Sequence, residues 1–118
     1  MKVSELTGPL LDLWVAKSAK IDVVLRTYSG VKQVFLAPLP YQEFPDERYS
    51  PSTDWSQGGP IIEREDIAFS YKTNTGYARA HIVHRDQVKS ITHYGDTKLI
   101  AAMRCYVASK FGEEVADE

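Results

Sequence analysis

The histidines are the side chains of this sequence that come nearest to a metal site. His81 and His84 are separated by two residues, and His93 follows soon after. If residues 77–83 form a strand, side chains three positions apart point to opposite faces of the sheet, so the His81 and His84 imidazoles do not converge on one ion. No nearby carboxylate stands at ligand spacing. The sequence therefore predicts surface histidines on a β-hairpin, with no bound metal and no cofactor.

Cys105 is the one cysteine of the chain and a candidate nucleophile. It lies in a strongly helical stretch with Ala101 and Ala108 nearby, and nothing in the sequence places a histidine beside it. A partly buried packing cysteine is therefore favoured over a reactive thiol. The common hydrolase motifs, such as Gly-x-Ser-x-Gly and His-Glu-x-x-His, are also missing from the sequence. No catalytic residue is predicted, and the sequence favours a protein that is not an enzyme.

A polar run near the middle of the chain has two readings. In YSPSTDWSQGGPIIERE, residues 49–65, Ser52, Thr53 and Asp54 precede Trp55. Such side chains bond nearby backbone N–H groups, which favours a structural corner with Trp55 as its hydrophobic anchor. The alternative is a pocket in which charged groups lie beside the indole ring. The candidate pocket residues are Trp14, Asp54, Trp55, Glu63, Arg64 and Arg104.

The Gly58-Gly59-Pro60 sequence before a predicted helix could in principle bind an anion, since free N–H groups at a helix start attract negative charge. A P-loop would require a lysine followed by Ser or Thr, and neither follows at the required spacing. The next charged side chain is Glu63, which has the wrong sign. A phosphate-binding loop is therefore not expected.

Basic residues gather in the window from residue 72 to residue 110, which holds seven lysines and arginines against two aspartates. Tyrosines are interleaved with them, a composition suited to phosphate contact and base stacking. An ordinary solvated hairpin with tyrosines in the core is the favoured reading, because the pI is not extreme and no nucleic-acid motif appears. The candidate nucleic-acid contacts are Arg79, Arg85, Lys89 and Lys98.

The elements that position these residues surround a long segment without periodicity, residues 38–60, which holds five of the six prolines. A loop of this length in a small domain is either disordered or functional. Its rings of Tyr41, Phe44, Tyr49 and Trp55 could each bury roughly 150–250 Å². We therefore expect these four rings to fasten the loop to the body of the protein.

Two helices are predicted at the ends of the chain. The first follows Thr7, with Pro9 in its first turn and apolar residues at helical spacing. The last is capped by Asp96 or Thr97 and stops at Gly112. A third, short helix is predicted to begin at Pro60.

β-Strands are predicted between the two terminal helices. IDVVLRTY and VKQVFLA are rich in β-branched residues and are separated by Ser29-Gly30, which predicts a hairpin. DIAFSYK and YARAHIV predict two more strands around a TNTG turn. The expected fold is α+β, with the N- and C-terminal helices packed on one small, mainly antiparallel sheet and the Pro- and aromatic-rich loop clamped over one end.

Composition limits the class of protein. The chain has 118 residues, 43% hydrophobic and 25% charged, and a net charge of −2, as in a soluble globular domain. We expect one domain over residues 1–112 and a frayed acidic tail over residues 113–118. No apolar run is long enough to cross a membrane and no signal-peptide pattern starts the chain, so a cytoplasmic location without membrane contact is expected.

Three segments together resemble the NinX-type family of small phage proteins: MKVSELTGPLLDLWVAK, YSPSTDWSQGGPIIERE and LIAAMRCYVASKFGEEV. They cover both ends and the long loop, in the order expected, whereas residues 67–94 give little to match. The resemblance implies a phage or prophage origin in a bacterial host and a biochemical role that is not established. It carries over no catalytic residues.

Three functions are then expected in order of preference. The first is a non-enzymatic accessory protein that binds a protein partner. The second is a nucleic-acid binder that uses the basic window, residues 72–110. The third is an enzyme or small-ligand binder with a pocket near Trp14, Asp54, Trp55 and Arg104.

Overall fold

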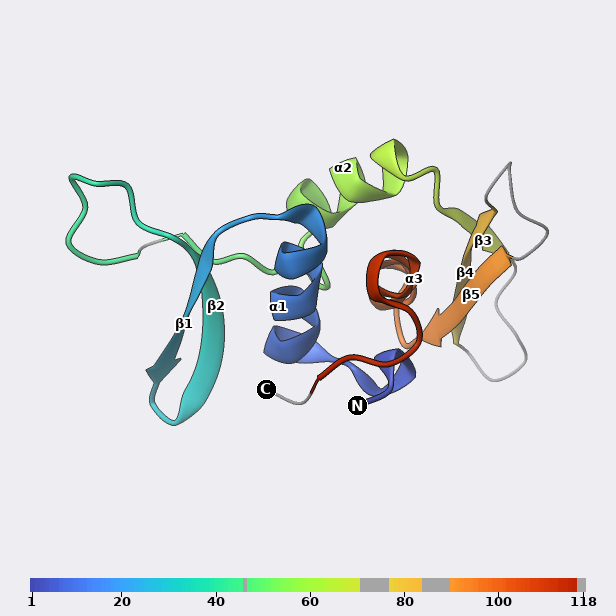
Figure 1. Cartoon of the computed structure of the whole chain (residues 1–118), viewed down its shortest axis with the longest axis horizontal. Coiled ribbons are helices and arrows are strands. Elements are labelled where there is room, and N and C mark those ends of the chain that lie inside the picture. The colour runs from blue at the N-terminus through green and yellow to red at the C-terminus, as the bar shows by residue number, and fades with distance from the viewer. Residues whose placement is uncertain (46, 71–76, 84–89, 117–118) are drawn as a thin grey trace.

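Four layers follow one another along the longest axis of the molecule, as a computed structural model shows (Figure 1). A β-hairpin at one end is followed by helix α1, then helix α3, then a three-stranded sheet, and helix α2 crosses one side. The structure describes residues 1–45, 47–70, 77–83 and 90–116. This is a single α+β domain, as predicted, but its strands form two separate antiparallel sheets instead of one.

The hairpin joins β1 (Val23–Tyr28) to β2 (Val31–Leu36) and lies where the sequence placed it. Ser29 and Gly30 have φ of 53° and 81°. A two-residue turn with positive φ at both positions matches the right-handed twist of the strands, which is why this turn closes the hairpin. Residues 47–49 then pair with the outer side of β2.

The second sheet has the order β3-β4-β5, formed by Ala68–Ser70, Ala78–Val83 and Ser90–Gly95. The last of these strands was not predicted. Ala80 of β4 and His93 of β5 lie opposite each other on the inner face of this sheet, and both are buried against α3. The TNTG turn of the prediction lies outside the described residues.

Helices α1 (Gly8–Ala19) and α3 (Lys98–Phe111) form the centre of the core. Thr97 caps α3, because its Oγ1 accepts a hydrogen bond from the Ile100 N–H at 3.1 Å, and Gly112 ends the helix. The sequence predicted the cap at Asp96 or Thr97 and the end at Gly112. Because α1 lies between the hairpin and α3, it is buried on more than one face. Its buried residues are Leu11, Asp12, Leu13, Trp14, Val15, Ala16 and Ser18.

Helix α2 spans Trp55–Arg64, so the prediction that it begins at Pro60 was wrong. The cap decides the start: Asp54 Oδ1 accepts a hydrogen bond from the Ser56 N–H at 2.9 Å, which satisfies one of the free donors of the first turn. Pro60 therefore lies inside the helix. Asp54 therefore makes the local capping bond that the sequence predicted. The helix that it caps begins at Trp55 and not at Pro60.

The expectation that four rings fasten the long loop was wrong for three of them. Tyr49 is 5% exposed, whereas Tyr41, Phe44 and Trp55 are 82%, 71% and 54% exposed. Tyr49 is buried because its backbone joins β2 and carries the ring into the core. Tyr41 and Phe44 belong to a loop that extends beyond the hairpin, where no core face lies opposite (Figure 1). Trp55 is the first residue of α2, whose buried side is formed by Gly58 and Ile61.

The first residues of the predicted acidic tail, Glu113 to Val115, pair with the N-terminus, while residues 117 and 118 lie outside the described residues. The Val3 N–H donates to the Glu113 carbonyl and the Val115 N–H to the Met1 carbonyl, both at 2.9 Å. The Val115 side chain is buried. Within the described residues, no helix is both long enough and apolar enough to span a membrane.

Candidate binding surfaces

Two residues of the predicted pocket, Trp14 and Arg104, make contacts that stabilise the core. The Trp14 ring is buried against the Phe111 ring, with centroids 5.2 Å apart. Arg104 joins two parts of the core: its Nε donates to the Leu6 carbonyl at 2.9 Å and its Nη1 to the Tyr94 carbonyl at 2.6 Å. Burial lowers the pKa of the Arg104 guanidinium and the charge of Asp96 opposes this, but the group stays cationic at neutral pH.

The other members of that set lie on or beside α2. Asp54 caps the helix, and its pKa is lowered mainly by the hydrogen bonds from Ser56. Trp55 and Glu63 are exposed. Arg64 Nη2 donates to the Tyr106 hydroxyl at 3.2 Å. Among the described residues, the hydrogen bonds of Asp54 and Arg64 therefore go to Ser56 and Tyr106, not to Trp14 or Arg104.

A polar contact that the sequence did not reveal fixes the loop to α1. Asp12 is buried, and its Oδ1 accepts a hydrogen bond from the Ser52 N–H at 2.8 Å. Burial raises the pKa of the Asp12 carboxyl, while hydrogen bonding to Ser52 and the charge of Arg48 act in the opposite direction. Nearby, burial raises the pKa of Tyr49 to about 12. In the sequence, the feature that indicates this contact is a lone aspartate within an apolar stretch, LLDLW.

Cys105 is a packing cysteine, as its helical position predicted. The side chain is fully buried, and its thiol donates to the Ala80 carbonyl at 3.1 Å. Burial raises the pKa of the Cys105 thiol to about 12, so almost no thiolate exists at neutral pH. This residue is therefore a poor candidate for a nucleophile.

The prediction of surface histidines was wrong for His93, which points to the opposite face of the sheet from His81. His93 is buried in β5 with Nε2 2.7 Å from Glu113 Oε2, so it joins the sheet to the C-terminal segment. His81 lies opposite Thr92 on the outer face of the sheet, while His84 is outside the described residues. In the part of the chain that the structure describes, no three His, Cys, Asp or Glu side chains are grouped as a metal site requires.

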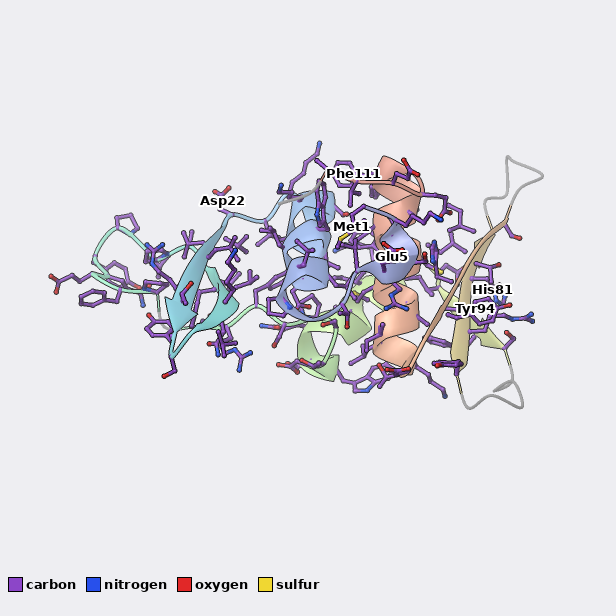
Figure 2. The ribbon with its side chains drawn as sticks, turned by 90° about the horizontal axis from the view of Figure 1, so that it is seen from below. Met1, Glu5, Asp22, His81, Tyr94 and Phe111 are labelled. Atoms are coloured by element: carbon purple, nitrogen blue, oxygen red, sulfur yellow. The ribbon has the colours of Figure 1, made fainter. Side chains whose placement is uncertain are left out.

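The predicted nucleic-acid contacts are only partly placed. Arg79 lies opposite both Ser70 and Tyr94 in the sheet, and its Nε donates to Ser70 Oγ. Tyr94 is exposed and extends from the face away from α3, beside His81 (Figure 2). Lys98 Nζ lies 5.7 Å from the centroid of the Phe69 ring. Arg85 and Lys89 are outside the described residues.

An apolar surface lies at the other end of the molecule. We define the arm as residues 21–45, which contain the hairpin and the first part of the long loop. A cavity of about 490 Å³ separates the arm from the start of α1. It is lined by Thr7, Pro9, Leu10, Leu13, Leu25, Gly30, Val31 and Lys32. Several large apolar side chains of the arm are exposed as well: Ile21, Leu25, Tyr28, Val31, Leu39, Tyr41 and Phe44.

These features define a small α+β domain that carries an exposed apolar arm. The family model described as bacteriophage P22, NinX matches residues 2–110 of the chain. The protein therefore belongs to the NinX family, which confirms the resemblance of the three sequence segments. A search of curated proteins finds no match.

Proposed function

We propose that this protein is a phage or prophage accessory protein without enzymatic activity, which binds a protein partner through the arm. The exposure of Tyr41 and Phe44 on the projecting loop carries the proposal. Large exposed apolar residues gathered on one surface mark interaction sites, and aromatic residues are enriched where protein interfaces gain most of their energy. The cavity between the hairpin and α1 adds an apolar concave surface on the same arm, and neither of these two rings lines it.

Hydrogen bonds order part of the loop that carries these rings. The Gln42 side chain accepts a hydrogen bond from the Leu39 N–H at 3.0 Å, and the Gln42 N–H donates to the Leu39 carbonyl at 2.8 Å. Farther along, the Glu47 carbonyl accepts from the Leu36 N–H at 2.8 Å, which returns the chain to β2. Ordering these segments before binding reduces the entropy lost on association.

Photo-crosslinking in the bacterial host tests this function. A benzoylphenylalanine replaces Phe44 in one variant and Tyr94, at the opposite end of the molecule, in a control variant. We expect a discrete protein adduct from position 44 that disappears when Tyr41→Ser is added. Equal adducts from both positions, or none from position 44, would refute a partner site on the arm.

A second candidate function is nucleic-acid binding on the outer face of the β3-β4-β5 sheet. The exposed Tyr94 opposite Arg79 supports it, because one ring and one guanidinium side by side suit stacking and phosphate contact. Affinity for a generic oligonucleotide should then fall steeply with rising salt and weaken in Tyr94→Ala. Binding that is missing, or that does not respond to salt, excludes this function. The third reading, an enzyme or small-ligand pocket, is not proposed, because Asp54 and Arg104 are already engaged in hydrogen bonds that stabilise the fold.

A further inference from the structure

The two edges of the hairpin sheet are unlike each other. On the β2 side, the Tyr49 N–H donates to the Val34 carbonyl at 2.9 Å and the Leu36 N–H to the Glu47 carbonyl at 2.8 Å. The chain thus covers this edge with its own backbone. On the β1 side, no strand of the described chain lies alongside Val23–Tyr28. One six-residue edge of this sheet is therefore open.

The register shows which groups of β1 point outward. Asp22 and Ala37 form a hydrogen-bonded pair, since the Ala37 N–H donates to the Asp22 carbonyl at 3.0 Å. Antiparallel pairs alternate between bonded and non-bonded, so Val23, Leu25 and Thr27 direct their N–H and C=O groups away from β2. The Leu25 carbonyl accepts only an exposed contact from its neighbour, the Arg26 side chain, at 3.0 Å. An added strand can displace that contact.

This edge has little of the usual protection against pairing. Proteins shield open edges with proline, charged side chains, bulges or a covering element, and Arg26 is the one charged residue of this strand. The strand VVLRTY contains no proline and no lysine, is rich in residues that favour strands, and pairs with β2 without a bulge. Leu25, at the middle of the outward-pointing residues, is 41% exposed and also lines the cavity beside α1.

We propose that this edge binds the same edge of a second copy of the chain, in antiparallel orientation, with a two-fold axis at Leu25. Leu25 then lies opposite the partner's Leu25, and Val23 lies opposite the partner's Thr27. All three outward-pointing residues are paired, and each pair exchanges two hydrogen bonds. Arg26 lies opposite the partner's Val24, so no like charges meet. The sequence of β1 is thus complementary to itself, as a two-fold interface requires.

The self-pairing fits the neighbouring cavity. A leucine placed opposite Leu25 lies beside the apolar side chains of Leu10 and Leu13, which line the same cavity. A short strand contact lies at the small end of protein interfaces, so we expect reversible dimers with Kd on the order of micromolar. This assembly goes beyond the proposed partner site, because the exposed rings of Tyr41 and Phe44 take no part in it.

Sedimentation velocity over a range of protein concentrations tests the dimer, with two charge variants. Leu25→Lys and Leu25→Glu each place like charges opposite each other, so each should be monomeric where the wild type is dimeric. An equal mixture of the two should form dimers again, because lysine then faces glutamate. A wild-type protein that stays monomeric at about 1 mM, variants that dimerise like the wild type, or a mixture that stays monomeric would overturn the proposal. Tyr41→Ser serves as the control and should dimerise normally.

Amide exchange on the wild type provides a test that does not depend on the variants folding. The N–H groups of Leu25 and Thr27 point outward and should exchange more slowly as the protein concentration rises. The Arg26 N–H, which faces β2, should be protected at every concentration. Exchange at Leu25 and Thr27 that does not depend on concentration, or that slows only when another protein is added, would rule out a second copy at this edge.

Discussion

Tyr49 is 5% exposed and Trp55 is 54% exposed, although both are large aromatic residues of the same Pro-rich segment. The difference comes from the backbone around each residue. Tyr49 pairs with Val34 of β2, which faces the core, whereas Trp55 is the first residue of a helix that buries Gly58 and Ile61 instead. Side-chain hydrophobicity alone therefore does not decide burial. The neighbouring backbone decides whether a core surface lies opposite the ring.

Asp12 gives a prediction about pH. Its pKa is raised in the folded protein, mainly by burial, above the value near 3.8 that it has when unfolded. The unfolded state therefore ionises first as the pH rises. The stability that the protonated carboxyl provides is fully present below about pH 3.8 and is lost as the pH rises through the folded pKa. In Asp12→Asn, the amide oxygen can still accept the Ser52 N–H. Because the amide does not ionise, this fall in stability with rising pH should be absent from the variant.

Urea unfolding between pH 3 and pH 7 measures the effect. The stability of Asp12→Asn relative to the wild type should increase with pH and then level off. Asp54→Asn is the matched control with the opposite sign, because hydrogen bonds from Ser56 lower the pKa of that exposed carboxyl. The stability that the ionised Asp54 carboxylate provides is present above about pH 3.8 and is lost as the pH falls through the lowered pKa. A pH-independent difference for Asp12→Asn would contradict the burial argument.

At the scale of elements, local signals identified some parts of the fold and could not identify others. Ser29-Gly30 is a turn signal that lies within the hairpin itself, so the sequence predicted that hairpin correctly. The strand β5 depends on pairing with β4 and on burial of His93 against α3. The local sequence of β5 predicts neither of these contacts. The contacts of the candidate pocket residues could not be predicted from the sequence for a related reason. Trp14 and Arg104 meet their partners through tertiary packing that local patterns do not specify.

The packing of α2 gives a prediction with a control one residue away. A Cβ added at Gly58 would meet the carbonyl oxygen of Pro51 and lie 2.7 Å from Leu99 Cδ2. A Cβ at Gly59 has only the Trp55 ring nearby, at 3.8 Å. Gly58→Ala should therefore lower the free energy of unfolding by about 1–3 kcal/mol through overpacking. Gly59→Ala should keep or raise it by up to about 1 kcal/mol, because alanine favours helix. Denaturant unfolding of both variants measures these free energies. Equal changes in the two variants would mean that α2 does not approach Pro51 this closely.

The shape of the whole molecule reflects its arm. The radius of gyration is 14.7 Å and the principal extents are 46 × 31 × 27 Å. A chain of this length packed compactly has a radius of about 13.5 Å. The hairpin and its loop account for the elongation, since they extend from α1 at one end of the long axis (Figure 1). Partner binding and self-pairing are both proposed for this arm, whereas the core gathers around α1 and α3.

The two ends of the chain complete that core, and this gives the prediction for the whole molecule. Removing residues 113–118 takes away the carbonyl that accepts the Val3 N–H, exposes the surface that Val115 covers, and leaves His93 without Glu113. We expect a loss of about 2–4 kcal/mol, from one buried apolar side chain and one orphaned donor.

Thermal unfolding of the truncated chain measures this loss. Glu114→Ala in the full chain is the control. Glu114 bridges Lys2 through backbone groups, and its side chain is exposed, so this change should stay within about 0.5 kcal/mol. A truncated chain as stable as the full one would show that the tail only rests on the surface. A truncated chain that is destabilised but still binds through the arm would show that stability and binding reside at opposite sides of α1.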